Sequence, residues 1–228
     1  MKEQLSKGWK LRGYGLGVKT QRAFCIIFLI VGTLFKLSPL ETEYMGIDVG
    51  AVFLFCSAMF PAQLVMSLDM SQMVQASPYK KKLQTSIPAK MTTAGFMIML
   101  GWSIFLQVIS CMISGKNFAD QGVKLLMTGM WAFVILLFTG VCYKFFVVSM
   151  IVMYIFIYIF IFGAGMPLEI GLHFFIPKGF IHPLVAIVAD IVLVLTGGVI
   201  QYGLMKLFYK FPLSKAAFGA AIKREMNA

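Results

Sequence analysis

The sequence predicts an all-α membrane protein with six transmembrane helices, and three observations lead to this fold class. Its 228 residues are 60% hydrophobic and only 13% charged, whereas soluble domains contain ~25% charged residues. Six apolar runs approach or exceed the ~20 residues that a helix needs to cross a bilayer. Lysine and arginine are concentrated in alternate connections between these runs. Together these features indicate a multi-pass chain.

A six-span transmembrane domain is predicted over residues 23–208. Its apolar runs are residues 23–40, 49–68, 91–113, 125–143, 146–165 and 181–208. The fourth and fifth runs are almost continuous, but ~40 residues exceed one crossing, so Lys144 is placed in a turn between them. Residues 1–22 are too long and too charged for the start of a signal peptide, and no small-residue cleavage site follows, so the first span is expected to be retained. Residues 209–228 form a basic tail.

The distribution of lysine and arginine predicts the orientation. Of the 20 basic residues, sixteen lie in segments that share one side if the N-terminus is cytoplasmic. The other four are Lys36, Lys116, Lys124 and Lys178. The positive-inside rule therefore predicts cytoplasmic termini in a cell membrane. The net charge of +11 is explained by topology and by anionic lipid, and no nucleic-acid partner is expected.

No motif for catalysis, metal binding or nucleotide binding is found. The two histidines, His173 and His182, lack the partners of an HExxH site. The segment Gly13–Thr20, GYGLGVKT, lacks the glycine that a phosphate-binding loop requires directly before Lys19. The chain is therefore not expected to be an enzyme or to bind a cofactor. Small apolar packing roles are expected for the cysteines within the spans, which are Cys25, Cys56, Cys111 and Cys142.

A polar insert at residues 69–90 separates the second and third spans. It is longer than the ~2–8 residues that join antiparallel helices. Ser77 can cap a helix with Pro78 at its first position, so the sequence predicts a short surface helix bracketed by Pro78 and Pro88. The alternative is a solvated lysine run that only enforces topology.

The basic N-terminal segment, the insert with its SPYKKKL core and the six-span layout resemble the type-2 ABC exporter permease family. The resemblance implies an N-terminal interfacial elbow helix and a coupling helix in the insert, which docks on a separate ATPase. It also implies two ATPase subunits, which carry ATP and Mg²⁺, a second permease chain and a bacterial source. The coupling residues would be Ser77, Pro78, Tyr79, Lys80, Lys81, Lys82 and Leu83.

The segment at residues 166–182 is apolar but broken by prolines, which predicts that it lies at the outer interface. Phe174 and Phe175 fit as aromatic anchors there. The resemblance implies a re-entrant segment with these residues at an outer gate. An ordinary interfacial loop is the alternative.

Span six contains the one acid that lies well inside a predicted span. At 100° per residue, Asp190, Gly197 and Gln201 share a stripe close to Ala186, which should not face lipid. A buried acid indicates a functional site, either in transport or in a hydrogen bond between helices. No lysine or arginine is expected at the depth of Asp190. Asp190 is therefore expected to face an internal water-filled cleft, or to stay protonated and hydrogen-bonded to a residue such as Gln63 or Gln107, although the sequence alone does not pair them. The proposed translocation path comprises Asp190, Gln201, Gln63 and Gln107.

Three function classes remain open. The first is the permease subunit of an ABC exporter, and the second is a proton-coupled secondary transporter that uses Asp190. The third is a non-transporting immunity or sensor subunit. The 17 methionines and 22 phenylalanines suit an adaptable apolar path for an amphipathic or hydrophobic cargo, with a peptide favoured over lipid or a drug.

Overall fold

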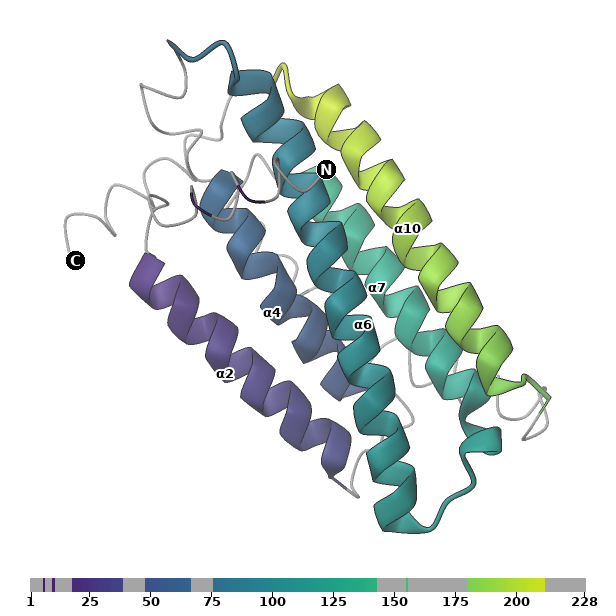
Figure 1. The fold of residues 1–228 in the computed structure, drawn as a ribbon. Helices are drawn as coiled ribbons and strands as arrows, with labels where there is room; N and C mark the ends of the chain where they lie inside the picture. Colours follow the sequence, from purple (N-terminus) through teal and green to yellow (C-terminus); the bar gives the residue numbers. More distant parts are fainter. Residues whose placement is uncertain are drawn as a thin grey trace.

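The computed structural model describes residues 18–38, 48–66, 76–142 and 180–211, together with Ser6, Lys10 and Ile155. Five helices are long and apolar enough to cross a membrane (Figure 1). They are α2 (Val18–Leu37), α4 (Val49–Met66), α6 (Ile87–Ser114), α7 (Gly122–Cys142) and α10 (Pro183–Phe208). No strand occurs in these ranges. The prediction of an all-α, multi-pass membrane protein is confirmed.

Five of the six predicted spans correspond to these helices, although their ends differ. Helix α2 begins at Val18 instead of residue 23, because its polar first turn continues the hydrogen-bonded backbone beyond the apolar run. Apart from Ser6, Lys10 and Ile155, four predicted features lie outside the described residues. They are the fifth span at 146–165, the elbow helix, the outer segment up to residue 179 with Phe174 and Phe175, and the tail beyond residue 211.

Helices α2 and α4 form an antiparallel hairpin with a close backbone approach. A Cβ atom added to Gly32 of α2 would lie 2.9 Å from the carbonyl oxygen of Gly50, and one added to Gly50 would lie 2.9 Å from that of Gly32. Such an approach is possible because neither residue has a side chain. The end of α2 is therefore held directly against the start of α4.

Helices α7 and α10 form the most extensive helix pair and run parallel to each other. Three positions of α7, at Gly122, Gly129 and Gly140, face in turn Ile181, just before α10, and then Asp190 and Gln201 of α10. From one contact to the next, the residue numbers rise on both helices together. The two helices therefore run in the same direction. Both helices therefore begin at the same end of the bundle (Figure 1).

The main apolar core lies between α4, α6, α7 and α10. Phe55 of α4 stacks on Phe96 of α6 with ring centroids 5.1 Å apart. Trp131 and Leu136 of α7 and Val194 of α10 complete the same cluster. Helix α4 is the most enclosed of the five, whereas only three residues of α2 are buried. The exposed apolar side of α2 is suited to lipid.

The two ends of the bundle differ in charge. The basic end contains the start of α2, the end of α4, the start of α6 and the end of α10, where Met66, Ile87 and Met205 pack together. Its described charges are all positive, and they are Lys19, Arg22, Lys80, Lys81, Lys82, Lys90, Lys206 and Lys210. The opposite end, called the polar end, contains Lys36, Asp48 and Gln107. This asymmetry agrees with the predicted alternation of basic connections.

The described part of the insert differs from its prediction, because Pro88 does not end a helix. The chain turns at Pro78 and then runs as a π-helix, η3 (Lys82–Ser86), directly into α6. Pro88 lies in the first turn of α6. A wider π-turn relieves the clash between a proline ring and the carbonyl four residues earlier. The lysines are therefore an extension of α6 and not a separate helix bracketed by prolines.

Candidate functional site: a buried charge cluster

Lys36, in the last turn of α2, is the central residue of a buried cluster at the polar end. Its side chain is only 1% exposed. The lysine stem passes beside Gly50, where an added Cβ atom would lie 2.8 Å from its Cγ atom. The absence of a side chain at residue 50 thus leaves the space through which the ammonium group reaches the interior.

Asp48 forms an ion pair with Lys36 and is fully buried. The other carboxylate oxygen, Oδ1, accepts a hydrogen bond from the backbone N–H of Ala51 at 2.9 Å. This contact caps the N-terminus of α4, where a carboxylate is also stabilised by the helix dipole. The hydroxyl of Thr128 on α7 donates a further hydrogen bond to Asp48. One side chain therefore joins α2, α4 and α7.

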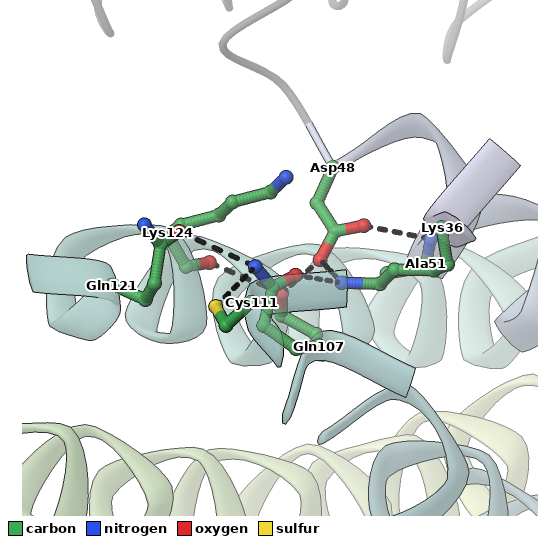
Figure 2. Close-up of polar contacts among 8 residues, drawn as sticks. Lys36, Asp48, Ala51, Gln107, Cys111, Gln121 and Lys124 are labelled. Atoms are coloured by element: carbon green, nitrogen blue, oxygen red, sulfur yellow. Dashed lines mark hydrogen bonds and ion pairs between the residues drawn. The ribbon is translucent and has the colours of Figure 1, made fainter. Parts of the chain in front are cut away.

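Gln107 of α6 extends the cluster (Figure 2). Its Oε1 atom accepts a hydrogen bond from Lys36 Nζ at 3.1 Å. Its Nε2 atom donates to Gln121 Oε1 at 3.3 Å, and more weakly to Cys111 Sγ at 3.9 Å. Gln121 belongs to the short 3-10 helix η4 (Phe118–Gln121) before α7. A hydrogen-bonded chain thus connects α2, α6 and the start of α7.

Asp190 of α10 lies beside this cluster without belonging to its hydrogen bonds. Its side chain is fully buried against Gly129, the residue after Thr128 on α7. Neither carboxylate oxygen makes a hydrogen bond of ordinary geometry within the described ranges. Lys36 and Asp48 are close enough to interact with it electrostatically. Three buried ionisable groups are therefore gathered at the polar end.

The predicted stripe on span six is confirmed as a buried face. Asp190, Gly197 and Gln201 are all buried, and Ala186 lies on the same side. Gln201 and Gly197 pack against α7 at Gly140 and Leu136 respectively. The role of Asp190 and Gln201 in a translocation path stays a prediction.

Within the described residues, neither glutamine considered as a partner of Asp190 is hydrogen-bonded to it. Gln107 bonds to Lys36 and Gln121 instead. Gln63 is buried near the other end of α4, and fifteen residues separate it from Asp48, or ~22 Å along a helix. A place for Gln63 and Gln107 in a translocation path is untested.

Sequence reasoning also missed the ion pair, because Lys36 was counted among the basic residues of the outer side and no base was expected near Asp190. Burial of Lys36 becomes favourable because the close approach at Gly32 and Gly50 brings it to a carboxylate. One signal for Asp48 was present in the sequence. An aspartate directly before an apolar run is a typical N-cap.

The residues predicted for coupling lie at the basic end with different exposures. Pro78, Tyr79, Lys81 and Lys82 are exposed, and Lys82 Nζ lies 5.7 Å from the centroid of the Tyr79 ring. Ser77 and Lys80 are partly buried, and the Ser77 hydroxyl accepts a hydrogen bond from the N–H of Tyr79. Leu83 packs into the bundle against the cluster around Met66 and Met205. Tyr79 and Leu83, which were both predicted for coupling, therefore lie on the surface and in the interior respectively.

Two cysteines and one histidine were also considered in the sequence. Cys56 packs in the main core, as predicted for a small apolar residue, while the side chain of Cys142 lies outside the described residues. His182 is exposed, and its Nδ1 atom accepts a hydrogen bond from the N–H of Leu184 as the cap of α10. Neither Cys56 nor His182 is part of the charge cluster.

Comparison of the chain with protein-family models, with curated proteins and with solved structures finds no significant match. The resemblance to type-2 ABC permeases therefore rests on the sequence features alone.

Proposed function

We propose that this chain is the membrane subunit of an ATP-driven exporter of the type-2 ABC kind. In this proposal the basic end faces the cytoplasm, as the positive-inside rule requires, and binds a separate ATPase. Two ATPase subunits, which bind ATP and Mg²⁺, and a second permease chain complete the transporter in a bacterial cell membrane. The cargo is an amphipathic or hydrophobic molecule, with a peptide favoured.

The observation that carries the proposal is the helical continuity between the exposed lysines and the buried charge cluster. Residues Lys82–Ser114 form one apolar helical segment of 33 residues, which is ~50 Å long. Lys81 and Lys82 are exposed at its first end. Gln107, near its other end, contacts Lys36. A partner that displaces the lysine segment would therefore move Gln107, because a packed helix transmits displacement along its axis.

The anchoring of the lysine segment supports the same role. Leu83 packs on the core of the basic end, and Gln84 and Thr85 are buried beside it. The backbone of the exposed lysines is thus held against the bundle by the buried residues that follow it. A docking surface needs such a fixed position, whereas a lysine run that only sets topology does not.

The parallel arrangement of α7 and α10 supports the six-span layout. Residue 142 lies at the basic end and residue 183 at the polar end. The connection between them has to join opposite sides of the membrane, which the proposed fifth span at residues 146–165 accomplishes.

The test combines copurification with transport. The complex is purified from native membranes and assayed for ATP hydrolysis, and the variant Lys80→Glu/Lys81→Glu/Lys82→Glu should lose the ATPase or uncouple it from peptide efflux in vesicles. A double variant, Lys206→Glu/Lys210→Glu, reverses exposed charges at the same end but on α10 and should retain both activities.

Two results contradict the proposal. One is a wild-type complex that contains no ATPase, and the other is a triple variant with normal ATPase binding and efflux. Transport driven by a pH gradient without ATP would identify a secondary transporter instead.

A further inference from the structure

The buried cluster at the polar end has an unbalanced charge. Lys36 supplies one positive charge, whereas Asp48 and Asp190 supply two negative charges when both are ionised. All three side chains are at most 1% exposed. An uncompensated charge in such surroundings is strongly unfavourable, because neither water nor a counter-ion solvates it.

Asp190 is the acid without compensation. The ammonium group of Lys36 is engaged by Asp48 and by Gln107. Asp48 also accepts hydrogen bonds from Thr128 and Ala51. Among the residues that the structure describes, the backbone of Gly129 interacts with the Asp190 carboxylate, but it makes no hydrogen bond of ordinary geometry, and α7 covers the carboxylate at Gly129.

The charged and titratable groups near Asp190 come from each neighbouring element. Helix α2 supplies Lys36, the start of α4 supplies Asp48, and α6 supplies the neutral amide of Gln107 and the buried thiol of Cys111. More distant groups of η4, α7 and α10 are exposed or half-buried, and they are Asp120, Lys124 and His182. Of all these groups, Asp48 and Lys36 act on Asp190.

We propose that Asp190 is a proton-binding site, in which one proton forms the O–H group of a neutral carboxylic acid and balances the charge of the cluster. Binding takes a proton from water to one carboxylate oxygen, and no other bond forms or breaks. A metal ion is a poorer occupant, because no group of three His, Cys, Asp or Glu side chains within the described ranges is arranged to hold one. This site does not depend on the exporter proposal.

The location of Asp190 links its proton to helix packing. Since the carboxyl group is enclosed between α10 and Gly129 of α7, the proton exchanges with water only when the two helices separate locally. Loss of the proton then leaves a carboxylate that favours the separated arrangement. Protonation and the α7–α10 contact are therefore coupled.

Infrared spectroscopy of the full-length protein in micelles tests the assignment. Wild type with ¹³C-labelled aspartate should show the carbonyl band of a protonated aspartic acid at neutral pH. Asp190→Asn should lack this band, and Asp120→Asn, which alters an exposed acid at the same end, should keep it. Measurement in sodium chloride and in choline chloride at constant pH distinguishes a proton from Na⁺, and the band should be equal in both salts.

Thermal unfolding supplies a second measurement. A native state that holds one proton more than the unfolded chain loses stability as the pH rises, by up to about tenfold in the unfolding equilibrium constant per pH unit. Asparagine cannot release that proton. Wild type should therefore lose stability relative to Asp190→Asn as the pH rises above the unfolded aspartate pKa of ~3.9.

The assignment is overturned if labelled wild type shows no protonated aspartate at neutral pH, a result that needs no folded variant. It is equally overturned if sodium removes the band at constant pH, which would make Na⁺ the occupant. A band that persists in Asp190→Asn would place the proton on another aspartate.

Discussion

Replacement of Lys36 by methionine removes the positive charge from the buried cluster and nearly preserves the length of the side chain. Asp48 keeps its hydrogen bonds from Ala51 and Thr128 but loses its counter-ion. Gln107 loses the donor that lies 3.1 Å from its Oε1 atom. Removal of one partner from a buried ion pair costs ~3–5 kcal/mol, mainly because the remaining charge stays buried. Lys36→Met should therefore lower the free energy of unfolding by about that amount.

The double variant Lys36→Met/Asp48→Asn separates this explanation from a simple loss of packing. Asparagine caps a helix about as well as aspartate, and it leaves no buried charge. The double variant should therefore be more stable than Lys36→Met alone, although it has one more substitution. Lys19→Met, an exposed change on the same helix, should alter stability by less than ~0.5 kcal/mol.

Reversible unfolding of the purified protein in mixed micelles, followed by circular dichroism, gives the free energies of wild type, of the single variants Lys36→Met and Asp48→Asn, and of the double variant. If the loss of stability in the double variant equals the sum of the two single losses, the argument that an unpaired buried charge dominates is refuted. A loss below ~1 kcal/mol for Lys36→Met would show that water reaches the pair.

Two further predictions concern the close helix contact and the orientation. Gly50→Ala places a Cβ atom 2.8 Å from the Cγ atom of Lys36 and 2.9 Å from a backbone oxygen, so unfolding in the same micelles should show a loss of ~1–3 kcal/mol. Gly101→Ala meets open space and should be neutral or slightly stabilising. In a cysteine-free background, Tyr79→Cys should be shielded from an impermeant thiol reagent in intact cells and Asn117→Cys should react, since both sites are exposed at opposite ends. Labelling of Tyr79→Cys alone would reverse the proposed orientation.

The transmembrane helices could be predicted from the sequence because their signal is local. An apolar run of sufficient length has few alternatives to a helix in a membrane. The buried stripe with Asp190 and Gln201 was predictable for the same reason, since helical periodicity places both residues on one face. Periodicity does not state which neighbour covers that face, so contact with α7 was not predictable.

The charge cluster could not be predicted because it depends on contacts between distant residues. Lys36 and Gln107 are 71 positions apart, and their contact requires the approach of α2 to both α4 and α6. Pro88 illustrates a different limit. A proline after a polar segment usually marks a break, but the π-turn before α6 absorbs it, and no residue of the insert signals a π-turn.

The ion pair between Lys36 and Asp48 also bears on the order in which the protein enters the membrane. These residues are only 12 positions apart, whereas Gln107 and Thr128 lie on helices that are synthesised later. A lone lysine near a membrane interior is costly, but the hairpin of α2 and α4 contains its own counter-ion. The first two described helices can therefore enter the bilayer together as a neutralised pair. The later arrival of α6 and α7 then encloses charges that are already paired, so neither Lys36 nor Asp48 has to be buried alone.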